Sequence, residues 1–287
     1  MKTSTEIASI AKVIGEEKAV EAIAKAGFDA WDFSMTEMAN IDWEKNVITY
    51  ADHPLGRKDY LKFARKLKQI GEDNGICCNQ SHAPFPTIGF IREECVKRAL
   101  ECTAEVGGEI CVIHPDCYAS VEQNIETYQK LLEFAKPLGV KIATENMWAW
   151  DNEKDHAFPI ACSDHKSFKE YFDLLNDQSF VACVDIGHAE MRGLGTNSVQ
   201  MILTLKDKVQ ALHIHDNDLH HDSHAIPYSM KMDFSPIVRA LKEINYKGYF
   251  TLEAVSFMNS FNTDNAFDGV KQLYASIRKM ADEFESL

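Results

Sequence analysis

The chain has 287 residues, 45% of them hydrophobic, which is enough to bury one large core, and we expect a single domain over residues 1–287. Its 44 acidic and 30 basic side chains give a net charge of −14, which argues against nucleic-acid binding through bulk positive charge. No segment reaches the ~20 consecutive apolar residues of a membrane span, so no membrane partner is expected.

Hydrophobic periodicity predicts strands and helices that alternate along the chain. In chain order, each predicted strand and the helix after it are Thr3–Ile10 and Glu16–Ala26, Ala30–Ser34 and Arg57–Asn74, Ile76–His82 and Ile91–Val106, Glu109–His114 and Val121–Leu138, Val140–Glu145 and Asp164–Leu175, Phe180–Asp185 and Ser198–Leu205, Val209–His215 and Phe234–Ile244, and Tyr249–Glu253 and Asn265–Phe284. Glycines such as Gly27, Gly75 and Gly139 follow several helices, where a left-handed residue ends a helix at little cost. The pattern is a strand–helix unit repeated eight times.

This alternation predicts an α/β fold, a (β/α)8 TIM barrel built on one parallel sheet. A doubly wound open sheet is the alternative. No Gly-x-Gly-x-x-Gly or Walker-type loop follows any predicted strand, which removes the usual nucleotide site of an open sheet. The longest loops follow the second, fifth and seventh strands, at the end of a barrel where active sites lie.

The eight cysteines show no Cys-x-x-Cys spacing, and most lie within apolar strand or helix patterns. Such thiols are typical of reduced cysteines in an intracellular protein. We therefore expect a cytoplasmic protein without disulfides.

The stretch from Ala211 to His224 is the part of the chain richest in metal-binding side chains. Alternation along a strand places His213 and His215 on the same face. The loop after this strand adds Asp216, Asp218, His220, His221, Asp222 and His224. This mixture of nitrogen and oxygen donors suits a divalent metal.

Further polar side chains stand at or just beyond the carboxyl ends of the other predicted strands, which share one edge of a barrel. They are Asp32, His82, His114, Glu145, Asp185, His188 and Glu253. A cluster of carboxylates would repel and lose solvation without a cation, so the pattern predicts a metal site. The expected ligands form a mixed oxygen and nitrogen set for one Mn, Mg, Co or Zn ion, with open positions for a substrate: Glu145, Asp185, His213 and Glu253.

Several of these segments resemble those of one family. Ala143-Thr-Glu-Asn146, Val184-Asp-Ile-Gly-His188, Leu212-His-Ile-His-Asp-Asn217 with Asp222-Ser-His224, and Thr251-Leu-Glu253 are similar to strand ends of the xylose isomerase-like TIM barrels. This superfamily includes sugar isomerases and epimerases, inosose dehydratases and endonuclease IV-like AP endonucleases. The resemblance gives the four predicted ligands the family's metal positions. Either His213 or His215 can be aligned with the family's histidine ligand, and His213 is preferred because His213-x-x-Asp216 resembles the commoner pattern.

The resemblance implies a metal-dependent sugar isomerase or epimerase. A metal that binds both oxygens of an α-hydroxy ketone or aldose would polarise the carbonyl and acidify the adjacent C–H bond. Glu145 and Glu253 would be the catalytic residues on opposite faces of the substrate. Return of the proton by the same glutamate to the neighbouring carbon gives isomerisation, and reprotonation by the opposite glutamate gives epimerisation. The expected substrate contacts are His82, His188, Arg192, Trp148 and His215.

Three alternatives remain open. One is an inosose dehydratase-like lyase, and another is a catalytically inactive carbohydrate-binding barrel. The third is a phosphodiester hydrolase with up to three Zn ions, because nine residues resemble the ligands of the AP endonucleases: His82, His114, Glu145, Asp185, His188, His213, Asp222, His224 and Glu253. In that case His114, His188, Asp222 and His224 would be the additional metal ligands.

Two features favour the sugar chemistry over the nuclease. The segments Ser81-His-Ala-Pro-Phe85 and Glu145-Asn-Met-Trp148 lack the continuations that follow in the nucleases, and the acidic chain offers no cationic platform for DNA. The loops 216–233 and 255–262 contain no glycine, which favours an unphosphorylated sugar or polyol substrate. The apolar stripe of the last helix fits barrel packing and leaves a homo-oligomer open.

Overall fold

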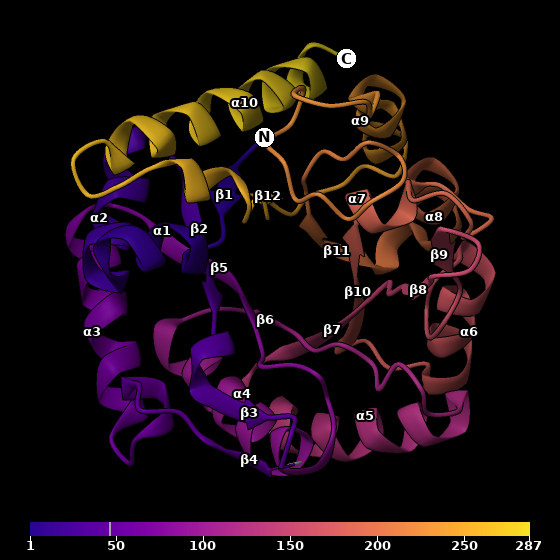
Figure 1. Ribbon diagram of the computed structural model, residues 1–287, viewed down its shortest axis with the longest axis horizontal. Coiled ribbons are helices and arrows are strands. Elements are labelled where there is room, and N and C mark those ends of the chain that lie inside the picture. The colour runs from indigo at the N-terminus through magenta and orange to yellow at the C-terminus, as the bar shows by residue number, and fades with distance from the viewer. Residues whose placement is uncertain (46) are drawn as a thin grey trace.

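The computed structural model describes residues 1–45 and 47–287, in which eight parallel strands form a ring surrounded by helices (Figure 1). The strands of the ring are β1 (Thr3–Thr5), β2 (Ala30–Ser34), β5 (Cys77–His82), β6 (Ile110–Val112), β7 (Lys141–Glu145), β10 (Phe180–Asp185), β11 (Val209–His213) and β12 (Phe250–Leu252). This is the (β/α)8 TIM barrel that the alternating pattern predicts.

The described strands close into a complete ring. Hydrogen-bonded neighbours follow the order β2–β5–β6–β7–β10–β11, and β1 pairs with β12, every pair being parallel. Two parallel bridges join these parts, Glu6–Asp32 between β1 and β2 and Ile214–Leu252 between β11 and β12. The backbone N–H of Ile214 donates to Thr251 O at 2.9 Å, for example. Closure rules out the doubly wound open sheet.

The helices form an outer layer whose apolar faces pack against the ring. They are α1 (Ala8–Ile14), α2 (Glu16–Ala26), α3 (Tyr60–Asp73), α4 (Val96–Val106) with the preceding π-helical turn η3 (Ile91–Cys95), α5 (Val121–Ala135), α6 (His165–Leu175), α7 (Ile186–Ala189), α8 (Ser198–Leu205), α9 (Phe234–Glu243) and α10 (Ala266–Ser286). Short 3-10 turns occupy Thr36–Met38, Pro54–Gly56, Lys136–Leu138, Lys206–Lys208 and Phe257–Ser260. A small cluster of buried side chains from four neighbouring strands packs separately from the main core: Ile110, Val112, Ala143, Val181, Cys183 and Ala211.

The first predicted strand, Thr3–Ile10, is wrong in its second half. The strand β1 ends at Thr5, and helix α1 begins at Ala8. Ile7 and Ile10 are both buried and lie three residues apart, which is the spacing of a helix face rather than of a strand. Glu6 consequently stands at the carboxyl end of β1.

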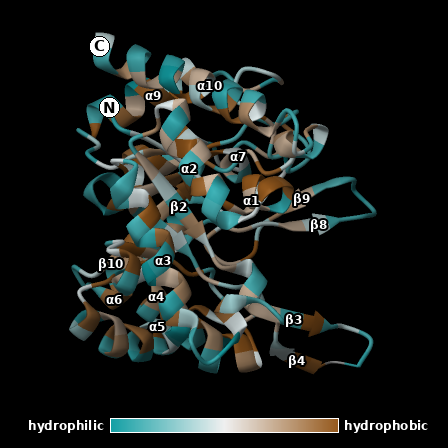
Figure 2. Ribbon diagram, turned by 90° about the vertical axis from the view of Figure 1, so that its left-hand side faces the viewer, coloured by the Kyte–Doolittle hydropathy of each residue, from teal (hydrophilic) through white to brown (hydrophobic). Residues whose placement is uncertain are grey.

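Two of the long loops contain hairpins that the sequence pattern did not predict. They are β3 (Ala39–Asp42) with β4 (Val47–Tyr50), and β8 (Ala149–Asp151) with β9 (His156–Phe158). Figure 2 shows both hairpins projecting from the same side of the molecule. Because they follow β2 and β7, this side is the carboxyl face of the barrel, as the loop lengths predict.

The helices and the cysteines can be compared with the expectations of no membrane span and no disulfides. In the part of the chain that the structure describes, no helix is both long and apolar enough to cross a lipid bilayer. All eight cysteines are free thiols; Cys77 is exposed, Cys117 is partly buried and the others are buried.

Candidate active site

A cavity of about 560 Å³ opens at the carboxyl face of the barrel. Its polar lining includes Glu6, Ser9, Lys12, Asp32, Glu37, His82, His114, Glu145, His188, Asp222, His224 and Glu253. Phe85, Met147, Trp148 and Val255 supply apolar parts of the wall. The cavity therefore collects most of the polar strand ends that the sequence singled out.

The four predicted metal ligands meet at the strand ends, and we call Glu145, Asp185, His213 and Glu253 the central group. One ligand atom from each lies within 4.8 Å of the others. His213 Nδ1 is 3.1 Å from Glu145 Oε2 and 3.6 Å from Glu253 Oε2. The fold brings them together because three of them end the parallel strands β7, β10 and β11, and Glu253 directly follows β12.

Two further histidines lie on one side of the central group. His82, His114 and Glu145, which we call the histidine-pair group, also place their ligand atoms within 4.8 Å of one another. His82 Nε2 lies 2.9 Å from His114 Nε2, and His114 Nε2 lies 3.3 Å from Glu145 Oε2. Glu145 therefore belongs to both groups.

His188, His215, Asp222 and His224 form a third set of donors, the loop group, within the same 4.8 Å limit. Asp222 Oδ2 lies 3.0 Å from His224 Nε2 and 3.3 Å from His188 Nε2. His215 Nε2 lies 3.1 Å from Asp185 Oδ1, which links this set to the central group. His213 and His215 both lie at the site, as expected for residues on one face of a strand, but His213 belongs to the central group and His215 to the loop group.

Several buried atoms of these groups that could bind a metal have no hydrogen-bond partner among the described residues. They are Glu145 Oε2, Asp185 Oδ2, both ring nitrogens of His213, and Asp222 Oδ1. A buried polar atom without a partner costs about 1–3 kcal/mol, and neighbouring carboxylates also repel. A divalent cation in the central group would satisfy Glu145 Oε2, Asp185 Oδ2 and one ring nitrogen of His213, so the residues present fit a metal.

The electrostatic surroundings distinguish the two candidate catalytic glutamates. Burial raises the pKa of Glu253. Burial acts in the same direction on Glu145, but the neighbouring His213 and His114 outweigh it and hold the pKa of Glu145 well below its ordinary value. In the metal-free site Glu145 is thus kept ionised, whereas the carboxyl group of Glu253 holds a proton more readily.

The histidines of the outer groups are also shifted, in opposite directions. Burial lowers the pKa of His114 to about 4, which favours its neutral form. Burial opposes a charge on His224 as well, but the adjacent Asp222 and Glu253 raise its pKa to about 9.

A family model described as the xylose isomerase-like TIM barrel matches residues 20–280. The chain belongs to this family. An uncharacterized protein of Methanocaldococcus jannaschii is 24% identical over 252 residues, which are 82% of this chain and 77% of that protein. A solved structure of a D-tagatose 3-epimerase-like protein superposes with a TM-score of 0.72 and 20% identity over 99% of both chains. A structure of the IolI protein with a binding zinc atom superposes with a TM-score of 0.73 and 16% identity over 100% of both chains.

This xylose isomerase-like barrel brings three of the five predicted substrate contacts to the cavity wall, namely His82, His188 and Trp148. His215 is fully buried and lies within the loop group, outside the described cavity lining. Arg192 is exposed and is also outside that lining. His215 lies beyond the end of β11, and Arg192 lies beyond the end of β10. The direction of each side chain therefore depends on the fold of the loop and not on strand alternation.

Glu6 is a cavity residue of this barrel that the sequence reasoning missed. It is 4% exposed, lines the cavity and accepts a hydrogen bond from the backbone N–H of Ser9 at 2.9 Å. Burial raises its pKa to about 7. The spacing of Ile7 and Ile10 could have revealed it, because a strand that ends before these two residues places Glu6 on the rim.

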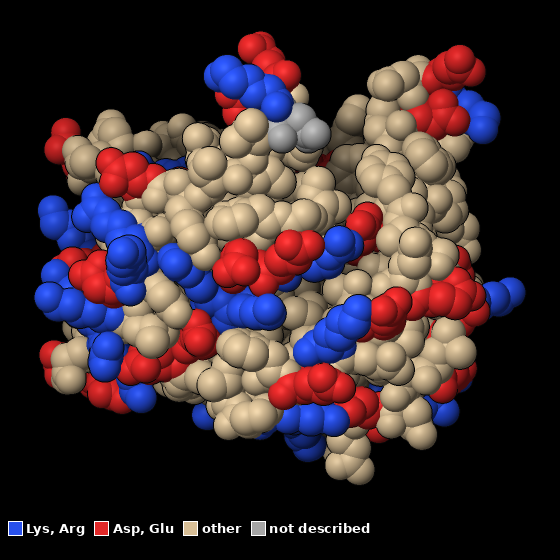
Figure 3. Space-filling model, turned by 90° about the horizontal axis from the view of Figure 1, so that it is seen from below, with Lys and Arg blue, Asp and Glu red and all other residues tan. Residues whose placement is uncertain are grey.

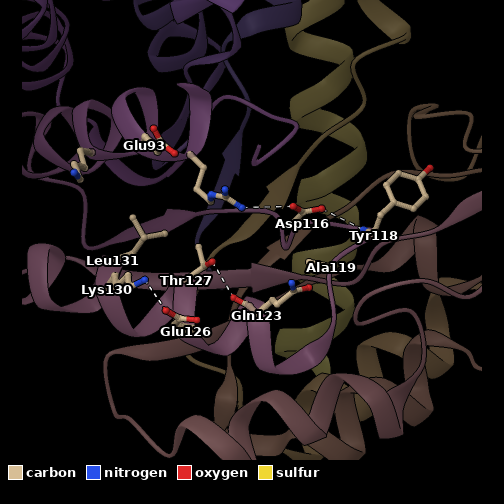
Figure 4. Close-up of a pocket in the computed structure, with 11 residues that line it drawn as sticks. Glu93, Asp116, Tyr118, Ala119, Gln123, Glu126, Thr127, Lys130 and Leu131 are labelled. Atoms are coloured by element: carbon tan, nitrogen blue, oxygen red, sulfur yellow. Dashed lines mark hydrogen bonds and ion pairs between the residues drawn. The ribbon is translucent and has the colours of Figure 1, made fainter. Parts of the chain in front are cut away.

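A larger hollow, of about 650 Å³, lies on the side of the barrel between η3, α4 and α5 (Figure 4). Its charged side chains pair with one another: Arg92 lies 3.7 Å from Asp116, and Lys130 lies 2.7 Å from Glu126. Acidic and basic side chains intermingle over this face of the molecule (Figure 3). Among the described residues, none of the metal-binding groups includes a residue of this hollow. The candidate active site of this protein is therefore the cavity at the carboxyl face.

Proposed function

We propose that this protein is a divalent-metal-dependent isomerase or epimerase of an unphosphorylated sugar or a related polyol ketone. The observation that carries the proposal is the central group, three carboxylates and one imidazole within 4.8 Å at the edge of a cavity of about 560 Å³. A mixed oxygen and nitrogen set of this kind suits Mn, Mg, Co or Zn rather than a closed structural zinc site. The names of the related structures, an epimerase-like protein and a zinc-binding IolI protein, support the same chemistry.

Glu145, Asp185, His213 and Glu253 would hold the ion. When bound, a divalent ion would polarise the substrate carbonyl and stabilise the negative charge of an enediolate. Glu253 would take the proton from the carbon next to the carbonyl, a role supported by the raised pKa of its carboxyl group in the metal-free site.

The position of the second glutamate sets the outcome of the reaction. Glu145 and Glu253 come from β7 and from the end of β12, which are separated in the ring by β10 and β11. We infer that they approach the substrate from opposite faces. Return of the proton by Glu253 to the neighbouring carbon gives isomerisation. Epimerisation requires protonation of the original carbon from the opposite face, by a proton that Glu145 takes up from water while Glu253 releases its own to water.

The charge of the cavity favours a neutral substrate. Six carboxyl groups line it, against Lys12 as the one lysine or arginine and two histidines with a raised pKa, His188 and His224, among the lining residues that the structure describes. A phosphate group would be repelled there, whereas sugar hydroxyls can donate hydrogen bonds to carboxylates. Trp148 offers a flat apolar surface for the C–H face of the sugar.

The test is turnover of free ketoses and inososes in D2O, followed by NMR. Metal-depleted protein should be inactive, and one of Mn, Co, Mg or Zn should restore activity, with deuterium appearing at the carbon next to the carbonyl. Full activity after verified metal removal would contradict the metal dependence. Loss of water from an inosose without any isomerised or epimerised product would instead identify a dehydratase-like lyase.

One observation favours a second candidate, a phosphodiester hydrolase with up to three zinc ions. The histidine-pair group, the central group and the loop group form one continuous array, since the first two share Glu145 and His215 links the last two at 3.1 Å from Asp185. Several zinc ions in such an array can activate water for hydrolysis. Cleavage of a duplex with an abasic site by the zinc-loaded protein, together with no turnover of any sugar, would replace the isomerase proposal.

A further inference from the structure

We propose that Asp32 is a positioning residue that fixes the tautomer and the ring orientation of His213, an inference that rests on the proposed metal site. Asp32 is 1% exposed and lies in β2, outside the central group. Its Oδ2 is 3.4 Å from His213 Nε2. The other ring nitrogen, Nδ1, faces Glu145 and Glu253. The two nitrogens of His213 thus point to two different kinds of partner.

A hydrogen-bond network sets the role of Asp32 in this contact. Gln80, its neighbour across β2 and β5, donates from Nε2 to Asp32 Oδ2 at 3.0 Å. The orientation of the Gln80 amide is fixed at its other end, where Oε1 accepts hydrogen bonds from Asn79 and Thr251, each at 3.3 Å. Because Gln80 must donate, Asp32 Oδ2 must accept.

The tautomer of His213 follows from this arrangement. A carboxylate oxygen that faces Nε2 at 3.4 Å favours the form of the neutral imidazole that carries its proton on Nε2. The lone pair is then on Nδ1, directed at the carboxylates of Glu145 and Glu253, where a metal would lie. A carboxylate on the far nitrogen of a metal-binding histidine also increases the basicity of the ligand.

The buried carboxylate is hard to explain by packing alone. Apart from the Gln80 bond and the His213 contact, Asp32 gains little, since its Oδ1 has no hydrogen-bond partner among the described residues. Burying a charged group with so few partners destabilises the fold. An asparagine would fill the same space without this charge, so we infer that the carboxylate is kept for its effect on His213.

The variant Asp32→Asn tests the inference, with Zn²⁺ as the probe and a chelator of known affinity as the competitor. The relevant site is the one that disappears in His213→Ala. The amide oxygen of an asparagine can still accept from Gln80, but it lacks the negative charge that increases the basicity of His213, and we expect Zn²⁺ to bind about 10–100-fold more weakly. Asp29→Asn is the matched control, because Asp29 accepts hydrogen bonds from Thr3 at 2.8 and 3.1 Å, before β2 begins. It should leave the Zn²⁺ affinity unchanged.

The outcomes separate the two proposals. If wild-type protein binds no Zn²⁺ at the site defined by His213, the proposed metal site fails and the role of Asp32 fails with it. If wild-type protein binds Zn²⁺ and Asp32→Asn binds it equally well, only the role of Asp32 is overturned.

A measurement on the wild-type protein keeps the inference testable if Asp32→Asn does not fold. Long-range ¹H–¹⁵N spectra of the zinc-loaded protein report which imidazole nitrogen carries the proton. His213 should be protonated on Nε2 and coordinated through Nδ1. Protonation on Nδ1 would overturn the proposal.

Discussion

At the residue scale, the proposed reaction depends on the difference between two glutamates. Burial raises the pKa of Glu253, whereas His213 and His114 hold that of Glu145 low against the same effect. On this difference we base the proposal that Glu253 is the first base, while Glu145 is kept ionised.

The variant Glu253→Gln tests this assignment. Glutamine keeps the shape of the side chain but cannot take a proton, so we expect kcat on the active sugar to fall about 10²–10⁴-fold while substrate binding stays detectable. Exposed Glu243 on α9 provides the control, and Glu243→Gln should leave kcat unchanged. Turnover by Glu253→Gln close to that of wild type would remove Glu253 from the mechanism.

Glu6 gives a second prediction, on stability and pH. Its pKa is raised by burial from 4.5 to about 7 in the folded protein. Because the pKa is raised, the contribution of protonated Glu6 to the free energy of unfolding is fully present below about pH 4.5. This contribution is lost as the pH rises through about 7. The variant Glu6→Gln lacks this loss, so its free energy of unfolding relative to wild type should increase by about 3 kcal/mol between pH 4.5 and pH 8.

Urea unfolding of both proteins at the two pH values, with a chelator present, measures this difference. A difference between Glu6→Gln and wild type that is the same at both pH values would show that Glu6 is not held protonated by burial.

At the element scale, the loop group depends on a close approach between α7 and the end of β11. A Cβ atom at Gly187 would lie 1.9 Å from His215 Cε1 and 2.4 Å from His215 Nδ1. Glycine is required here because the backbone of α7 passes directly over the imidazole. The position of His215, and with it the loop group, is therefore set by a residue that carries no side chain.

The variant Gly187→Ala should push His215 out of place. We expect it to lower the free energy of unfolding by about 1–3 kcal/mol, the usual cost of overpacking a buried site. The double variant Gly187→Ala/His215→Ala removes the clash and should recover part of the loss, which urea unfolding of both proteins can measure. Wild-type stability in the single variant would contradict this packing argument.

Elements also explain which parts of the site could be predicted from the sequence. Glu145, Asp185 and His213 end regular strands, and the carboxyl ends of parallel strands share one edge, so their meeting follows from the pattern alone. Asp222 and His224 lie in a long loop, and their positions depend on contacts that no periodicity encodes. The loop folds back because Asp216 and Ala225 exchange backbone hydrogen bonds at 2.8 and 3.0 Å.

At the scale of the whole molecule, the closed barrel was predictable because each strand–helix unit carries its own apolar pattern. The hairpins of the carboxyl face were not, since β3–β4 and β8–β9 are short and partly exposed and show little periodicity. The second hairpin nevertheless shapes the site: the ring of Trp150 in β8 stacks on His221 with ring centroids 5.3 Å apart. This contact holds the hairpin against the loop that carries Asp222 and His224.

Closure of the ring brings metal-binding side chains from separate strands together at one point. The described part of the cavity is acidic, and its central group fits one divalent ion. Such an ion would explain the buried atoms without hydrogen-bond partners, and the family membership supports the proposed sugar chemistry. The number of metal ions per chain follows directly from this account.

The measurement that tests it is the metal content of the untagged, purified protein by inductively coupled plasma mass spectrometry, as atoms per chain. We predict about one Mn, Mg, Co or Zn per chain, and loss of that ion in His213→Ala. Protein that contains no divalent metal even after incubation with these ions would contradict the central claim. Two or three tightly held zinc ions per chain would contradict the single-metal isomerase and favour the hydrolase.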